Sequence, residues 1–74
     1  MTVNVELFGQ LAPGTQRRQS LTLDRPMTVR EVASLLEIDT DHIGLIVIDN
    51  VQSELDDWVP PDCRLCFFPP MSGG

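Results

Sequence analysis

The sequence has no lysine and no tyrosine, and its 74 residues include one histidine, one tryptophan and two cysteines. All five basic residues are arginines, so the chain offers no ε-amine. Chance in a small protein is one explanation of this absence. The other is functional, since a chain without lysine cannot attach to itself through a lysine side chain.

Long hydrophobic runs are also missing. No apolar run approaches the roughly 18 residues that cross a bilayer, and the first residues lack the basic-then-apolar form of a secretion signal. We therefore expect a cytoplasmic protein without a membrane partner. The net charge of −6 repels phosphate backbones, which argues against nucleic acid and favours partners with basic surfaces. A hydrophobic content of 42% in so short a chain indicates one folded domain with a small core.

Catalytic side chains are scarce. A nucleophile and base would have to combine His42, the only histidine, with a serine such as Ser72, which lies in a tail that nothing holds rigidly. Cys63 and Cys66 have the C-x-x-C spacing of zinc and redox sites, but on a strand this separation places the sulfurs on opposite faces. We expect a buried Cys63 and a half-exposed Cys66.

The acidic residues of the segment 53–62 lack the register of a calcium-binding loop. We interpret this group, Glu54, Asp56 and Asp57, as a solvated loop, with Trp58 as its only large apolar anchor. The two prolines Pro60 and Pro61 exclude a regular element there beyond one helical turn. The sequence therefore predicts no catalytic residue and no metal ligand in the chain.

Alternation predicts the strands. Residues 2–8 alternate strictly, and Phe8 alone places a large apolar ring on the polar face. A turn at Pro13-Gly14 separates this strand from a second, in which Leu21 and Leu23 resume the alternation. The expected core face of the first strand carries Val3, Val5 and Leu7, and its other face carries Asn4, Glu6 and Phe8.

A helix is predicted from Thr28, because Thr28 and Glu31 have the spacing of a capping box. Its apolar stripe comprises Val29, Val32, Ala33 and Leu36, with Leu35 at the margin, and the helix should span about nine residues.

Two further strands are predicted. Residues 44–48, GLIVI, precede a turn at Asp49-Asn50, and their continuous apolar run is typical of a strand covered on both faces. One helix can cover only one face, so the second covering must come from elsewhere in the chain or from another protein. The last strand runs from Cys63 to Phe68 and ends at Pro69. We expect an α+β fold, with a mixed sheet of four to five strands packed against one helix.

The C-terminal residues FFPPMSGG combine a strand end, a rigid proline pair and two glycines. Glycine has no Cβ, so Gly73-Gly74 can thread a narrow channel in an extended form and bring an α-carboxylate to a buried catalytic centre. Pro69 and Pro70 stiffen the exit and keep the tail from folding back.

These residues resemble the MoaD/ThiS family of ubiquitin-like sulfur carriers, which have the β-grasp fold. The resemblance covers essentially the whole chain and rests on LFGQL (7–11), PMTVREV (26–32) and above all FFPPMSGG (67–74). The C-terminus is most similar to the small subunit of molybdopterin synthase. Family members usually carry Gly-Asp before the last strand, where this chain has Pro61-Asp62, so we expect that glycine turn to be lost.

The resemblance implies a β-grasp domain over residues 1–69 and a flexible tail over 70–74. An E1-like adenylating enzyme would use Mg-ATP to adenylate the carboxylate of Gly74, and a persulfide sulfur donor would convert the adenylate to a thiocarboxylate. Gly73 and Ser72 would thread the partner's channel. The chain would bind no cofactor and would be a non-catalytic carrier for a sulfurtransferase, with the large subunit of molybdopterin synthase or an equivalent enzyme as acceptor.

The same resemblance implies a partner interface formed by Phe8, Phe68, Pro69 and Pro70. Either Ile46 and Ile48 or their neighbours of opposite parity would extend it. The alternative is that both phenylalanines cover the edges of the core.

Three functions stay open. The first is a sulfur carrier, for molybdopterin or for thiamine or another thio-metabolite. The second is a ubiquitin-like modifier conjugated through Gly74, and the third is an interaction module that never activates its terminus.

Overall fold

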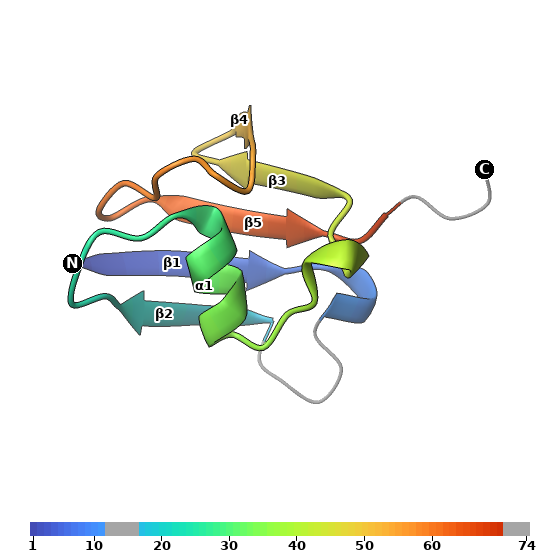
Figure 1. Ribbon diagram of the computed structural model, residues 1–74, viewed down its shortest axis with the longest axis horizontal. Coiled ribbons are helices and arrows are strands. Elements are labelled where there is room, and N and C mark those ends of the chain that lie inside the picture. Colours follow the sequence, from blue (N-terminus) through green and yellow to red (C-terminus); the bar gives the residue numbers. More distant parts are fainter. Residues whose placement is uncertain (12–16, 71–74) are drawn as a thin grey trace.

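The described part of the chain forms one mixed sheet with an α-helix across one face (Figure 1). The computed structural model describes residues 1–11 and 17–70. The strands are β1 (Thr2–Leu7), β2 (Arg18–Thr22), β3 (Leu45–Ile48), β4 (Val51–Ser53) and β5 (Arg64–Phe68). The α-helix α1 spans Val29–Leu35, and two short 3-10 helices, η1 and η2, span Gly9–Leu11 and Thr40–His42.

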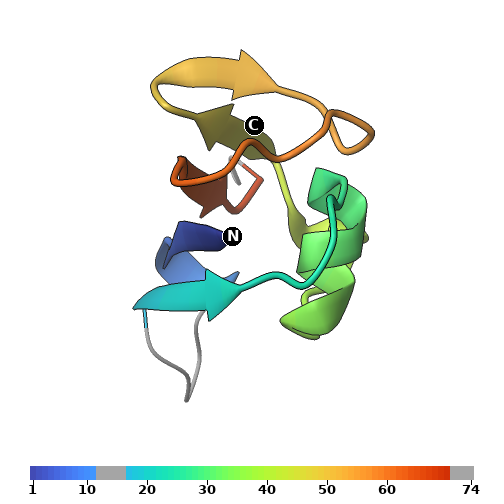
Figure 2. The ribbon, with the colours of Figure 1, turned by 90° about the vertical axis from the view of Figure 1, so that its left-hand side faces the viewer.

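The five strands lie in the order β2-β1-β5-β3-β4. The central strands β1 and β5 run parallel, while β2, β3 and β4 pair antiparallel with their neighbours. Figure 2 shows α1 on one side of the sheet and no described element on the other. We call that uncovered side the open face. The predicted α+β architecture, a mixed sheet packed against one helix, is confirmed.

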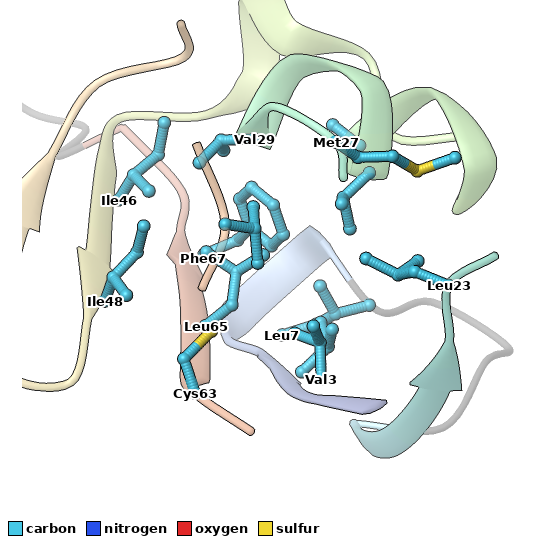
Figure 3. Packing of buried hydrophobic residues seen from close by; sticks show 14 residues of the cluster. Val3, Leu7, Leu23, Met27, Val29, Ile46, Ile48, Cys63, Leu65 and Phe67 are labelled. Carbon is cyan, nitrogen blue, oxygen red and sulfur yellow. The ribbon is translucent and has the colours of Figure 1, made fainter. Parts of the chain in front are cut away.

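The core lies between α1 and the sheet (Figure 3). Alternation along β1 buries Val3, Val5 and Leu7 as predicted, and the central strand β5 adds Leu65 and Phe67. The helix α1 contributes its three buried residues, Val29, Val32 and Ala33, to this core.

No helix among the described residues is long and apolar enough to cross a membrane.

The capping box predicted for α1 is confirmed. Glu31 N donates to Thr28 Oγ1 over 3.3 Å, and Thr28 N donates to Glu31 Oε1 over 3.0 Å. Two further N–H groups of the first turn, those of Val29 and Arg30, donate to backbone oxygens of the 54–57 loop. This loop thus satisfies donors that a helix start leaves without partners. The helix spans seven residues, Val29–Leu35, where about nine were expected, and Leu36 forms its C-cap.

The described part of the chain covers only one face of the strand predicted at 44–48, and covering of the second face by another protein stays a prediction. The strand begins at Leu45, and only Ile46 and Ile48 are buried, because α1 covers one face of the sheet. Leu45 and Val47 lie on the open face, Leu45 exposed and Val47 half-buried. The residues that extend the apolar surface are therefore the neighbours of opposite parity to Ile46 and Ile48.

The edge strand β4 was missing from the prediction. Asp49 and Asn50 form the predicted turn, and both have positive φ, 48° and 70°. Such a two-residue turn matches the twist of a hairpin, so it returns the chain as β4, paired antiparallel with β3. Residues 54–62 contain turns but no helical turn. The short, polar sequence of β4, Val-Gln-Ser, gave no alternation to detect.

Trp58 is not the anchor of its loop. Its side chain is 65% exposed, whereas Val59 is buried and its N–H donates to Met27 O. The backbone is extended there, in a bridge between Trp58 and Thr28, so successive side chains point in opposite directions and Val59 takes the inward position. Pro61 and Asp62, which stand where the family has Gly-Asp, form a turn in which Asp62 adopts a φ of 59°.

Replacing Glu31 by alanine should lower the free energy of unfolding at neutral pH. The hydrogen bond from Thr28 N, followed by that from Arg25, holds the pKa of Glu31 below its ordinary 4.5. A lowered folded-state pKa stabilises the fold above the unfolded-state pKa, and this stabilisation is lost as the pH falls through the folded-state pKa. The difference between wild type and variant should therefore shrink below pH 4.5.

Urea unfolding at neutral pH and at about pH 3 measures this difference. Glu54→Ala, which removes an exposed carboxylate outside the helix, is the control and should change stability little at either pH. A Glu31→Ala effect that stays constant with pH would contradict the role of the ionised carboxylate.

Candidate functional site

The candidate site lies at one end of the sheet, where β5 ends (Figure 1) and Pro69 and Pro70 follow. The end of β1 and the start of β3 lie beside the end of β5. Two backbone hydrogen bonds fix this end: Phe8 N donates to Phe67 O over 3.0 Å, and Gly44 N donates to Phe68 O over 2.8 Å. The last residues of β5 are thus held on both sides before Pro69 and Pro70 follow.

Two glycines make room for the proline pair. A β-carbon on Gly44 would lie 2.7 Å from Pro70 N and 2.8 Å from Pro69 O, both backbone atoms. A β-carbon on Gly9 would lie 2.8 Å from Pro69 Cγ, and Gly9 also has a φ of 61°, which disfavours other residues. We call Gly9 and Gly44 the glycine cradle. It sets where the chain leaves the sheet and holds Pro69-Pro70 against the domain.

An apolar strip adjoins the cradle on the open face. The rings of Phe8 and Phe68 stack with centroids 4.4 Å apart and an interplanar angle of 8°. Leu45 pairs with Phe68 in the ladder, and Val47 follows on the same face. We define the apolar strip as Phe8, Phe68, Leu45 and Val47. Because the two rings cover each other, both phenylalanines are half-buried, so they do not face water fully as the alternation alone suggested.

A row of charged side chains lies next to this strip. Arg64 Nε donates to Glu6 Oε1 over 2.8 Å, and Arg18 Nε lies 3.7 Å from Glu6 Oε2. The contact with Arg64, and more weakly the charge of Arg18, holds the pKa of the Glu6 carboxyl below its ordinary value. The same hydrogen bond raises the pKa of Arg64. We call Arg18, Glu6 and Arg64 the arginine row; it joins β2, β1 and β5.

The strand β5 begins at Arg64, one residue later than predicted, so Cys63 directly precedes it. The two cysteines lie on opposite sides of the sheet, as the spacing predicted, and both are free thiols. Cys63 belongs to the core. The expectation of a half-exposed Cys66 is wrong: it is 6% exposed, because Glu6 and Val47 flank it in the ladder. Burial raises the pKa of both thiols, so at neutral pH they are protonated and poor nucleophiles.

The remaining polar candidates do not converge. His42 is exposed in η2, as a loop residue before β3 should be. Asp57 accepts a hydrogen bond from Glu54 N, and Asp56 pairs with Arg30. Across residues 1–11 and 17–70, no three acidic, histidine or cysteine residues are grouped as metal ligands. The carboxylates of the acidic loop therefore accept a hydrogen bond from the loop's own backbone or pair with an arginine of α1.

The structure brings together Phe8, Phe68, Pro69 and Pro70, the four residues predicted to form a partner interface. Their role there stays a prediction. Ser72, Gly73 and Gly74 lie outside the described residues. Sequence reasoning missed the glycine cradle and the arginine row, although Gly9 directly follows one predicted strand and Gly44 begins another, and these positions were a usable signal.

Comparison with known proteins shows similarity to solved structures. No protein-family model and no curated protein sequence matches the chain. Among solved structures, the crystal structure of SAMP1 from Haloferax volcanii superposes with a TM-score of 0.74 at 23% sequence identity, over 100% of both chains. SAMP1 is a ubiquitin-like small archaeal modifier. The fold of this chain is a β-grasp. The similarity places the cradle and the strip on a β-grasp domain, at the point where its last strand ends.

Replacing Gly9 by alanine should lower the free energy of unfolding by about 1–3 kcal/mol, through the clash with Pro69 Cγ and the unfavourable φ. In a Pro69→Ala background part of that loss should be recovered, because Cγ is absent. Gly44→Ala should be equally costly but should gain nothing from Pro69→Ala, since its β-carbon meets backbone atoms.

A double-mutant cycle by urea unfolding measures this coupling. Equal coupling of Pro69→Ala to both glycine variants would show that the cradle does not act by the two contacts described.

Proposed function

We propose that this β-grasp domain is a sulfur carrier, in which the carboxylate of Gly74 is activated and converted to a thiocarboxylate. The observation that carries the proposal is the glycine cradle. Pro69 and Pro70 leave the sheet along a fixed path beside the stacked Phe8 and Phe68. A partner that docks on the apolar strip would thus receive the following residues in a defined direction.

The chemistry needs a partner because a carboxylate is a poor acyl donor. Adenylation with Mg-ATP, which releases pyrophosphate, gives an acyl-adenylate whose leaving group is AMP. The terminal sulfur of a persulfide on the donor displaces AMP, and a thiol then cleaves the acyl disulfide to leave a thiocarboxylate. No residue of the described chain is positioned to catalyse these steps, so the chain contributes presentation: a rigid domain, a directed exit, and Ser72-Gly73 as a segment thin enough to thread a channel.

The proposed partners follow from that division of roles. They are an E1-like adenylating enzyme, a persulfide donor, and an acceptor enzyme equivalent to the large subunit of molybdopterin synthase. Molybdopterin is the first candidate for the recipient, on the resemblance of FFPPMSGG to the MoaD type of the MoaD/ThiS family. Thiamine and other thio-metabolites are the alternatives.

A second candidate function is protein modification through Gly74. The similarity to SAMP1, a small archaeal modifier, favours it. A modifier and a carrier share the adenylation step and differ in the nucleophile that follows, a lysine amine or a sulfur. Adducts to larger proteins that resist thiol reductants would indicate modification, and a thiocarboxylate without such adducts would indicate the carrier.

Incubation with the cognate adenylating enzyme, Mg-ATP and a persulfide donor should replace one oxygen of the chain by sulfur in the intact mass. Deleting Gly74 should abolish the change, because the reacting carboxylate would no longer lie at the end of the Gly-Gly pair. Ser34→Ala, at an exposed position of α1 on the other side of the sheet, is the control and should behave as wild type. An unchanged mass shift after deletion of Gly74 would refute the carrier proposal.

Replacing Phe8 by alanine should raise the KM for the chain in this reaction by about tenfold or more, since aromatic anchors at the centre of an interface dominate binding. Leu35→Ala is the matched control: it removes an exposed apolar side chain from α1, on the other side of the sheet. Its KM should stay near that of wild type. Steady-state kinetics with varied carrier concentration measures both, and equal effects of the two substitutions would argue against docking on the apolar strip.

A further inference from the structure

The charges of this protein are distributed unequally between the sheet and the rest of the chain. The charged residues of the five strands are Arg18, Glu6 and Arg64. All three share the open face, where two arginines against one glutamate leave a local charge of +1 on a chain whose net charge is −6. The open face is thus positive, although the rest of the chain is strongly acidic.

In the arginine row the central residue, Glu6, is largely buried, and the two arginines beside it are exposed. The Glu6 side chain is only 12% exposed, on the central strand β1, where Oε1 accepts a hydrogen bond from Arg64 Nε over 2.8 Å and Oε2 lies 3.7 Å from Arg18 Nε. The Arg18 side chain is 80% exposed and that of Arg64 is 53% exposed. Arginine presents a planar fork of donors that matches a carboxylate. Arg64 is therefore oriented by its hydrogen bond, and Arg18 stays accessible to a partner beside it.

The row and the apolar strip form one continuous surface. Glu6 precedes Phe8 by two residues on β1, and Cys66, beside Glu6 in the ladder, precedes Phe68 by two on β5. Residues two apart on a strand share a face. A partner that covers the stacked rings must therefore also approach Arg18 and Arg64.

We propose that the open face docks a protein surface that combines an apolar strip with at least one carboxylate placed against Arg18 and Arg64, and that this surface belongs to the enzyme that activates Gly74. The assignment to that enzyme rests on the proposed function. Complementary charge is what selects this partner: the net charge of −6 alone would point to a basic surface, whereas the charges on the contact face require an acidic one.

Two other occupants fit less well. A nucleic acid would meet two arginines on a chain that repels phosphate overall. A second copy of this chain would have to bring acidic residues from outside its strands to the row, because its own open face carries the same positive charge. The surface of an enzyme need not carry phosphate groups, and it can place its own carboxylates against Arg18 and Arg64.

The test is the KM for the chain in the ATP-dependent conversion by the cognate adenylating enzyme. Arg18→Glu should raise that KM about tenfold and leave kcat near wild type, because Arg18 is remote from the reacting carboxylate. The KM of wild type should rise with salt concentration, and that of Arg18→Glu should rise less. Arg30→Glu is the matched control: it makes the same charge change at an exposed arginine of α1 that also pairs with one carboxylate, Asp56.

The outcomes separate the two proposals. If wild type is not activated at all, the proposed function fails and this inference fails with it. If wild type is activated and Arg18→Glu has the KM and salt dependence of Arg30→Glu, only this inference is overturned, and a lower KM for Arg18→Glu would overturn it by showing a basic partner surface. A dimer in sedimentation equilibrium that Arg18→Glu dissociates would assign the face to a second copy, which also overturns it.

Discussion

The close approach of Pro69-Pro70 to Gly44 is the constraint on which the rest of the site depends. A β-carbon at Gly44 would collide with backbone atoms of the proline pair, so the residue must be glycine for β5 to end where it does. Gly44 N in turn donates to Phe68 O, which fixes the last residue of β5 beside the first of β3. Phe68 then stacks on Phe8 at a fixed distance. The exit path and the apolar strip are thus consequences of one contact between segments far apart in the sequence.

The elements that local chemistry dictates could be predicted from the sequence. Alternation identified the buried face of β1, and the Thr28–Glu31 spacing identified the start of α1, because both signals lie within a few residues. Predictions about exposure failed where neighbours on other strands decide it. Cys66 is buried because Glu6 and Val47 flank it in the ladder, and no feature of β5 alone contains that information.

The arginine row could not be predicted for the same reason, and the contacts of the glycine cradle could not be predicted either. Glu6, Arg18 and Arg64 come from three strands, and only the pairing register of β1 with β2 and β5 brings them together. A single sequence shows three unrelated charges. It also shows Gly9 and Gly44 as strand boundaries, whereas their role depends on where the proline pair passes. The resemblance to the MoaD/ThiS family drew attention to the terminus, but the contacts that direct it come from the two glycines.

The uneven charge distribution gives the small domain two distinct kinds of surface. The acidic remainder of the chain produces a long-range field that favours approach to basic regions of a partner, and this field is screened over about 8 Å at physiological salt. In the proposed docking the arginine row would act at shorter range, where Arg64 and the exposed Arg18 would favour a carboxylate beside the apolar strip. A partner surface that is basic throughout would be attracted but would not fit the open face. The choice of partner would therefore depend on the positive charge of the open face, which is opposite in sign to the net charge of the chain.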